Sequence, residues 1–395
     1  MIKKILVISP EFNEEFILYQ PWRQIYELGR KLASKGIEFA IGTNTSNKDE
    51  IFGLKIIQLN QKKIRILSQY SKKQIIQFNP DVIIWMGNPL SGSYIKKNSI
   101  DNIPVVIYIS TVHMLWKELK NFTIKEIFQS NLINFITAFY PFKNLVKNLN
   151  HSNIAGIIAT SETVKDRLIK LGVNNSKIEV SPLCFDDAFK GKNKFTNLDS
   201  KESFSICYMG PLNSIRGTDI LIDMMEMFKK NNLSIHLNFL LRTSNPKYDG
   251  KLLYEKCKKK GILDLVMINE GILGKKELYE AISNSDVVVL PTKFVWNEPP
   301  LSILETMMLG KPVITSNVCG IPEIVKNRGF ILNPDTDSFY NCVKDLVNKP
   351  NVIKQMSENG KEFVNSLPDW DTFCNWILDT LERFLQNSSN NKLSK

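Results

Sequence analysis

The sequence predicts an α/β protein made of two doubly wound domains, and three observations lead to this class. Short runs rich in Val and Ile alternate with amphipathic stretches, which is the pattern of a parallel sheet covered by helices. The alternation stops in a polar interval at residues 186–203 and then starts again. The chain of 395 residues is also too long for one ordinary core and suits two domains of roughly 150–200 residues each.

The first half of the chain is predicted to form one domain, residues 1–185. A helix between the first two strands has Ile25, Leu28 and Leu32 at helical spacing and Gly36 as its C-cap. A second helix follows its strand directly, with Ser161 as N-cap and Gly172 as C-cap. The predicted strands lie at residues 4–9, 38–43, 54–59, 81–87, 105–111, 156–161 and 177–182.

The second half begins after the polar interval 186–203, which we interpret as an inter-domain linker. Strands are predicted at residues 204–210, 234–242, 265–271, 286–292 and 312–317, within a second domain at residues 204–368. Residues 369–387 form a last amphipathic helix, whose apolar face carries Trp370, Phe373, Ile377, Leu381 and Phe384. The final residues, 388–395, are polar and are predicted to be disordered.

Composition indicates a cytoplasmic protein. No apolar run reaches the about 18–20 residues that a membrane span needs. The N-terminus is basic and then apolar, but Pro10 and Glu11 end the apolar run too early for a secretion signal. The six cysteines show no CxxC spacing, so neither a disulfide framework nor a zinc site is expected.

The net charge of +11 is concentrated in the first half of the chain. Residues 1–185 contain 24 Lys and Arg against 14 Asp and Glu, whereas the remainder contains 27 against 26. Either this is an ordinary solvated surface, or the first domain meets an anionic partner such as a membrane face or a lipid phosphate. Nucleic acid is the weakest alternative, because no helix-turn-helix, RNP-like or zinc-finger pattern accompanies the charge.

Three loops of the second domain follow predicted strands, at the edge of the sheet where α/β proteins bind ligands. The loop within 208–228 places Arg216 and Gly217 at a helix start, an arrangement that suits a phosphate. A polar and aromatic loop follows the strand that ends near Thr292. In the third, a helix opens after Pro300 with Ser302 and Glu305 on one face. The Glu305 carboxylate is either simply solvated, or it faces the cleft expected between the two domains and accepts hydrogen bonds from sugar or ribose hydroxyls.

The order and spacing of these motifs resemble a known family. "MGPLNSIRGTDILIDMM", "AISNSDVVVLPT" and "NEPPLSILETMMLGKPVITSNVCGIPEIV" are similar to the second domain of the retaining glycosyltransferases of family 4, which have the GT-B fold of two Rossmann-like domains. The resemblance extends into the first half through "LGRKLASKGIEF", "VVIYISTVH" and the stretch from residue 157 to 186. It covers about residues 1–325, and the match at 297–325 is the specific one.

The resemblance implies roles for individual residues. Glu305 matches the second glutamate of an E-x7-E motif, which contacts the nucleotide ribose in the family. For the first glutamate two assignments stay open: Asn297 has the right spacing, and Glu298 is one position too close. Arg216 replaces the usual diphosphate lysine, while Pro211 stands where the family has an arginine. The implied catalytic residues are His113, Arg216 and Glu298. The implied donor-binding residues are Gly210, Arg216, Gly217, Asn297, Glu298, Leu301, Ser302 and Glu305.

The resemblance therefore implies a retaining hexosyltransferase of cell-envelope polysaccharide or glycolipid synthesis. Its donor would be a nucleotide diphosphate sugar, its acceptor a glycan or a lipid-linked molecule, and it would need no metal or other cofactor. The basic first domain adds the expectation of peripheral contact with an anionic membrane. Two alternatives stay open, a catalytically degenerate protein that binds nucleotide sugar or glycan and a sugar-nucleotide epimerase of related fold.

Overall fold

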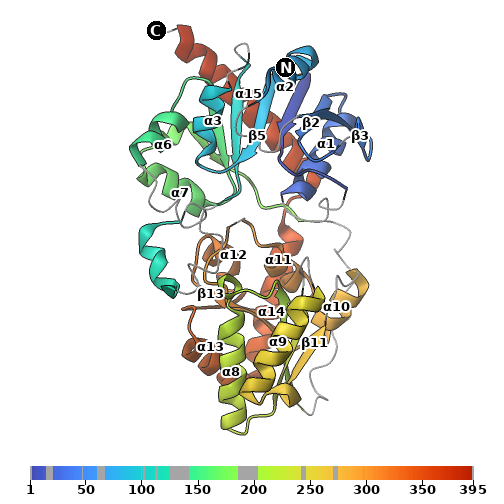
Figure 1. Cartoon of the computed structure of the whole chain (residues 1–395), viewed down its shortest axis with the longest axis vertical. Coiled ribbons are helices and arrows are strands. Elements are labelled where there is room, and N and C mark those ends of the chain that lie inside the picture. The colour runs from blue at the N-terminus through green and yellow to red at the C-terminus, as the bar shows by residue number, and fades with distance from the viewer. Residues whose placement is uncertain are drawn as a thin grey trace.

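The computed structural model contains two parallel β-sheets, each covered by helices (Figure 1). It describes residues 2–14, 21–46, 48–59, 67–98, 100, 103–111, 114–124, 142–185, 203–241, 246–269, 275–296 and 298–393. The first sheet lies in the upper lobe of Figure 1 and the second in the lower lobe. The predicted class, a GT-B arrangement of two Rossmann-like domains, is confirmed. Most of the predicted linker, 186–202, lies outside the described residues.

The first sheet has the order β3-β4-β2-β1-β5-β6-β7-β8, and only the β3–β4 pair is antiparallel. Alternate residues of β1 face two apolar clusters, with Ile5 and Val7 in one and Leu6 and Ile8 in the other. Burial on both faces explains the continuous apolar runs of these strands. The strands are β1 (Lys4–Ile8), β2 (Glu38–Thr43), β3 (Glu50–Ile51), β4 (Leu54–Gln58), β5 (Val82–Gly87), β6 (Val105–Ile109), β7 (Ile154–Ala159) and β8 (Ile178–Val180).

Five α-helices lie between the strands of this sheet along the described part of the chain. Ser161 caps α7 as predicted, because its side chain accepts a hydrogen bond from the Val164 backbone N–H. Gly36 and Gly172 both have positive φ angles beyond helix ends, as C-capping requires. The helices are α1 (Trp22–Ser34), α2 (Gln69–Phe78), α3 (Ser91–Lys97), α6 (Phe142–Leu149) and α7 (Glu162–Lys170), with 3₁₀ turns at Trp116–Asn121 and Asn175–Lys177.

The second sheet is wholly parallel in its order β11-β10-β9-β12-β13-β14. The chain builds outward from β9 to one edge and returns to build from β12 to the other, so the topological switch point lies between β9 and β12. The strands are β9 (Phe204–Gly210), β10 (Ile235–Leu241), β11 (Val266–Asn269), β12 (Val287–Leu290), β13 (Val313–Ser316) and β14 (Gly329–Leu332). The helices are α8 (Thr218–Lys230), α9 (Pro246–Lys260), α10 (Lys275–Ser283), α11 (Leu301–Met308), α12 (Ile321–Val325), α13 (Thr336–Leu346) and α14 (Pro350–Ser366), with 3₁₀ turns at Ser214–Arg216 and Leu263–Leu265.

The last helix, α15 (Trp370–Leu393), rises from between the lobes into the upper one (Figure 1). Its predicted apolar face joins the cluster of the first sheet, where Phe373, Ile377 and Leu381 are fully buried. The expectation of a disordered tail at 388–395 is wrong as far as Leu393, because the helix continues to that residue. No Gly or Pro follows Phe384, so nothing in the backbone ends the helix earlier. No helix of the described residues is long and apolar enough to span a bilayer.

The carboxyl ends of the two sheets face one another. Glu298 follows β12 in the second domain, and its backbone N–H donates to the Ser110 carbonyl just after β6 of the first, at 2.8 Å. Phe294 of the same loop is 1% exposed and belongs to the apolar cluster of the first sheet. This loop therefore contacts the first domain through both backbone and side chain.

Candidate functional site

A small cavity lies at the switch point of the second sheet, at the carboxyl ends of β9 and β12. Its walls include Arg216 from the loop after β9, Thr292 from the loop after β12, and Ser302 from the first turn of α11. Tyr208, Met209, Leu290 and Thr315 form the strand side of the cavity. In doubly wound sheets this is the place where ligands bind. Two side chains predicted to bind the donor, Arg216 and Ser302, thus line one cavity.

Backbone geometry at the cavity explains the predicted anion site. Asn213 accepts a hydrogen bond from the Arg216 backbone N–H at 2.8 Å, which holds a 3₁₀ turn directly before α8. Gly217 joins this turn to the helix with a φ of 70°, and a Cβ there would lie 1.9 Å from the Pro291 carbonyl oxygen. Only glycine fits so close to another backbone. Arg216 therefore lies directly before the N-terminus of α8, where backbone N–H groups favour negative charge.

Two neighbouring side chains complete this loop, and the sequence had not indicated them. The Tyr208 hydroxyl donates to the Pro211 carbonyl at 2.8 Å. Burial raises the pKa of Tyr208, and the nearby Arg216 charge opposes that shift. Lys293 is 7% exposed and its ammonium pairs with Asp219 in the first turn of α8 at 2.8 Å. A second cation thus lies beside the loop, although its charge is already shared with Asp219.

Glu305 lies on α11 one turn beyond Ser302 and is half-buried. The spacing of three residues puts the two side chains on neighbouring positions of the helix surface. Leu301, at the start of α11, is also half-buried and packs against the core of the second domain. Gly210 ends β9 with a φ of 151°, and a Cβ there would lie 2.9 Å from the Tyr208 hydroxyl.

The Glu298 carboxyl is buried between the two domains, with 3% of the residue exposed. One carboxyl oxygen accepts the Gly320 backbone N–H at 2.6 Å, and the other accepts the Ser161 hydroxyl of the first domain. Burial raises the pKa of Glu298, while the hydrogen bonds from Ser161 and Gly320 oppose that rise. A Cβ at Gly320 would lie 2.7 Å from the carboxyl, so the glycine makes room for it.

A second carboxylate, Glu323 of α12, also reaches the first domain. It accepts the backbone N–H groups of Glu162 at 3.0 Å and Thr163 at 2.7 Å, in the first turn of α7. The Thr163 hydroxyl donates to it as well. Negative charge is favoured at a helix N-terminus, where backbone N–H groups lack intrahelical partners. Glu298 and Glu323 therefore both meet the start of α7.

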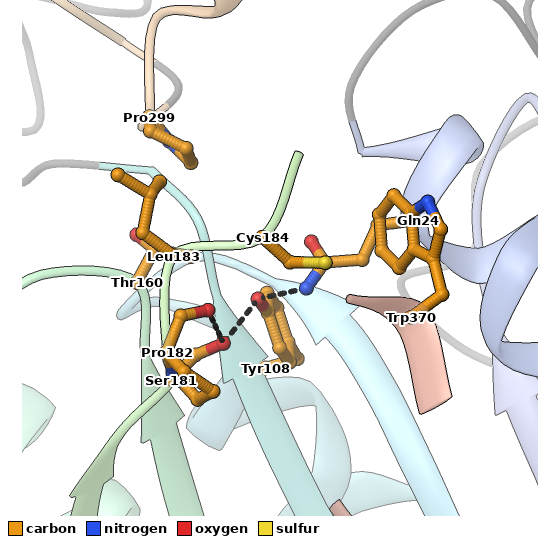
Figure 2. A pocket seen from close by; sticks show the side chains of 9 residues that line it. All are labelled: Gln24, Tyr108, Thr160, Ser181, Pro182, Leu183, Cys184, Pro299 and Trp370. Atoms are coloured by element: carbon orange, nitrogen blue, oxygen red, sulfur yellow. Dashed lines mark hydrogen bonds between the residues drawn. The ribbon is translucent and has the colours of Figure 1, made fainter. Parts of the chain in front are cut away.

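A polar cluster lies close by, at the carboxyl ends of the first-domain strands (Figure 2). Figure 2 shows the Tyr108 hydroxyl between the Gln24 amide, which donates to it at 2.6 Å, and Ser181, to which it donates at 3.2 Å. Pro299 of the second domain and Trp370 of α15 line the same small cavity. Burial raises the pKa of Tyr108 to about 12, so the phenol stays neutral near pH 7.

Two predicted site residues, His113 and Asn297, lie outside the described residues, so the choice between Asn297 and Glu298 stays open. Among the described residues, no group of three or more His, Cys, Asp or Glu side chains is arranged to hold a metal ion. Ser161, Lys293, Gly320 and Glu323 contribute to the site, although the sequence does not predict any of them as a site residue. Their contacts join segments as far apart as Glu162 and Glu323, which are 161 positions apart.

Comparison with known proteins matches each half of the chain to a family model. Residues 22–189 match the model of "Glycosyltransferase Family 4", and residues 189–363 match that of "Glycosyl transferases group 1". Over 88 residues the chain is 38% identical to an Escherichia coli UDP-Gal:alpha-D-GlcNAc-diphosphoundecaprenol alpha-1,3-galactosyltransferase, covering 22% of each protein. It is 23% identical over 184 residues to an uncharacterised 41.2 kDa protein in the cps region of Klebsiella pneumoniae, covering 45% of this chain. The chain thus spans 47% and 22% of the lengths of these curated relatives.

Solved structures resemble the whole chain in fold. Sucrose-phosphate synthase from Thermosynechococcus elongatus superposes with a TM-score of 0.70 at 16% identity, covering 98% of this chain and 100% of that one. Anabaena Alr3699/HepE in complex with UDP and glucose superposes with a TM-score of 0.69 at 15% identity, covering 97% and 100%. At these identities the likeness concerns the arrangement of the two domains.

Proposed function

Because this chain belongs to the group 1 glycosyl transferases of glycosyltransferase family 4, we propose that it transfers a hexose-type sugar from a nucleotide diphosphate sugar to a glycan or lipid-linked acceptor, with retention of the anomeric configuration. One observation carries the proposal. The cavity at the switch point of the second sheet brings Arg216 and Ser302 together at the start of α8. It combines a cation and hydroxyl groups beside the N-terminus of α8, and such groups can bind a sugar diphosphate.

The relatives support a class of donor and acceptor. The Escherichia coli relative is named for a UDP-galactose donor and an acceptor sugar linked through diphosphate to undecaprenol. The Anabaena structure holds UDP and glucose. A UDP-hexose is therefore the first donor to test, and a lipid diphosphate sugar the first acceptor. Such an acceptor is presented at a membrane, which agrees with the proposed peripheral location of the basic first domain on the cytoplasmic face.

The proposed reaction relies on charge rather than on a nucleophile and base pair. Arg216 and the N-terminus of α8 stabilise the diphosphate as its bond to the sugar breaks. The acceptor hydroxyl attacks the anomeric carbon from the same face and passes its proton to the oxygen of the leaving diphosphate. Glu305 holds the ribose hydroxyls of the nucleotide, and Glu298 contacts the transferred sugar. His113 is proposed to lie near that sugar as well. The proposal includes no metal cofactor, because fixed positive charge at the cavity takes that role.

The direct test is transfer from a panel of UDP-hexoses to synthetic lipid diphosphate sugars, in buffer with and without EDTA. Release of UDP together with a new glycoside of the donor's own anomeric configuration, seen by NMR, supports the proposal. Free sugar without a glycoside would indicate a hydrolase, and a changed nucleotide sugar would indicate an epimerase. Tight nucleotide-sugar binding by calorimetry without any turnover would indicate a binding protein.

Arg216→Ala is expected to lower kcat/KM by about 30-fold, equivalent to ~2 kcal/mol, because a charge-assisted hydrogen-bond partner of the diphosphate is lost. Arg216→Lys keeps the charge and should recover part of the rate. Arg30→Ala is the matched control, since that arginine is 57% exposed on α1 of the other domain. If Arg216→Ala lowers kcat/KM by less than about threefold, which corresponds to less than about 0.7 kcal/mol, the diphosphate binds elsewhere.

A further inference from the structure

The N-terminus of α7 makes two kinds of contact with the second domain. Glu323 accepts the backbone N–H groups of Glu162 and Thr163, which fixes the first turn of α7 against α12. The preceding residue, Ser161, contacts Glu298 through its side chain. Both contacts join positions more than 130 residues apart, so each exists only while the two domains are together.

The Ser161 hydroxyl has two partners at once. Its oxygen accepts the Val164 backbone N–H at 3.1 Å and so caps α7, while its proton is donated to Glu298. A hydroxyl has one proton and two lone pairs, so the capping bond leaves the proton free for the carboxyl. The capped helix thereby sets the direction in which that proton points.

The hydrogen bonds around Glu298 suit a carboxylate that must still meet a ligand. Gly320 and Ser161 each donate to a different oxygen. A carboxylate offers about four lone-pair positions, so about two remain for hydroxyl groups of a sugar. Two contacts with the first domain hold the loop that carries Glu298. The Ser110 carbonyl accepts the Glu298 backbone N–H, and the ring of Phe294 is buried in the apolar cluster of the first sheet. Backbone placement is thus secured by other contacts, and Ser161 acts on the side chain.

We propose that Ser161 is a positioning residue for Glu298: it supplies, from the first domain, the hydrogen bond that orients this carboxyl of the donor site, so that the carboxyl is set only when the domains are together. The inference rests on the proposed transferase function, in which Glu298 contacts the donor sugar. It adds a residue of the first domain to the donor site of the second. Donor chemistry and domain closure are thereby linked through one hydroxyl.

The test compares Ser161→Ala with Ser161→Thr and with Ser68→Ala. Ser68 caps α2 in the same domain and accepts the Ser71 backbone N–H at 3.1 Å, the same distance as in the Ser161 cap. Ser161→Ala is expected to lower kcat by about 10- to 100-fold with the donor KM changed by less than about threefold, as for loss of a hydrogen bond to a charged group. Ser161→Thr keeps both bonds and should restore the rate. Ser68→Ala should cost similar stability without lowering kcat.

The pH profile separates positioning from simple loss of the helix cap. Removing the Ser161 hydroxyl takes away one of the bonds that oppose the raised pKa of Glu298. The acid limb of kcat against pH should therefore move to higher pH in Ser161→Ala and stay in place in Ser68→Ala. If Ser161→Ala loses stability like Ser68→Ala but keeps the wild-type kcat and acid limb, the hydroxyl is only a helix cap and the proposal is wrong.

A readout that needs no turnover distinguishes failure of this inference from failure of the proposed function. Hydrogen exchange at the Gly320 amide, which donates to Glu298, should become faster in Ser161→Ala and remain unchanged in Ser68→Ala. A wild-type protein without transferase activity but with this exchange pattern would overturn the function and keep the positioning contact. An active enzyme in which Gly320 exchanges equally in both variants would keep the function and overturn the positioning role.

Discussion

At the scale of single residues, Glu298 is a buried carboxyl whose protonation should affect stability. Burial raises its pKa in the folded protein, against the hydrogen bonds from Ser161 and Gly320. In the unfolded chain the group loses its proton at lower pH, so the folded state binds more protons between the two pKa values. The stabilising contribution is full below the unfolded pKa and is lost as pH rises through the folded pKa.

Glu298→Gln removes this titration, and its melting temperature should therefore rise relative to wild type as pH increases from about 4 to about 8. Differential scanning calorimetry across that range measures the difference directly. Glu358→Gln, at an exposed position of α14, is the reference for removing a carboxyl without burial. A constant difference between Glu298→Gln and wild type across the range would show that Glu298 titrates alike in the folded and unfolded protein.

Gly217 combines a positive φ with close approach to the Pro291 carbonyl. Comparing it with Gly261, which has only the positive φ, separates the cost of the backbone conformation from the cost of the steric clash. Gly217→Ala should lower the free energy of unfolding by about 2 kcal/mol or more, since both the left-handed backbone and the 1.9 Å approach become unfavourable. Gly261 has a similar φ of 67° with nothing within 4 Å of its Cβ position. Gly261→Ala should therefore cost only about 1 kcal/mol. Equal losses in urea denaturation would show that Pro291 moves aside.

A site residue could be predicted from the sequence when its role depends on neighbouring positions, and could not when its partner is distant in the sequence. Arg216 and Gly217 could be singled out because a strand, a turn and a helix start are contiguous in the sequence. Ser161 could be predicted as a helix cap for the same reason, but its bond to Glu298 joins residues of different domains. Lys293 gave no signal either, because its partner Asp219 is 74 positions away.

At the scale of elements, α15 follows the second domain in the sequence but packs against the apolar cluster of the first sheet. Phe384 is 3% exposed and its ring covers Gly156 of β7, where a Cβ would lie 2.3 Å from the ring. Phe384→Ala should lower the free energy of unfolding by about 3–5 kcal/mol, because the substitution removes a buried ring and leaves a cavity in the core. Urea denaturation followed by circular dichroism measures the loss.

The matched control for this substitution is Phe52→Ala, since Phe52 is 56% exposed in the same domain. Its loss should stay below about 1 kcal/mol, because little apolar surface is removed from contact. If Phe384→Ala is no more destabilising than Phe52→Ala, α15 contributes little to the first domain.

Elements with strong periodicity were predictable and weak ones were not. The apolar face of α15 was read from residues spaced three and four apart, and the buried strands from their Val and Ile content. Two short strands were missed: β3 has only two residues, and β14 is half-buried throughout its four. The predicted end of α15 at residue 387 is too early, because a polar composition does not by itself end a helix.

At the scale of the whole molecule, the contacts between the domains could not be predicted from the sequence. Phe294 was visible as part of an aromatic loop after a strand, yet its burial in the cluster of the other domain depends on how the two sheets face each other. The separation of charge, in contrast, needs no structure. Residues 1–185 carry 24 basic and 14 acidic side chains, so the excess belongs to one domain.

We expect this charge to bring the first domain to an anionic membrane. Each basic residue near such a surface contributes about 1 kcal/mol. In the described residues, α2 places Lys72 and Lys73 beside Tyr70 and Ile76, which are 49% and 45% exposed. The further lysines of residues 61–66 and the segment 125–141 lie outside the described residues. An α2 surface of this composition can meet a headgroup layer with charge and with apolar contact together.

Sedimentation with vesicles tests this expectation, using anionic and neutral lipid at low and high salt. The protein should sediment with anionic vesicles at low salt and be released at high salt, because screening weakens the attraction. Lys72→Glu with Lys73→Glu should weaken binding by about 30-fold or more, because the loss of two basic residues corresponds to ~2 kcal/mol. The same double reversal at Lys258 and Lys259, two exposed neighbours on α9 of the second domain, should leave binding unchanged. Equal weakening by both pairs would mean that total charge, rather than the first domain, governs binding. Absence of binding to either lipid would favour an acceptor that is not held at a membrane.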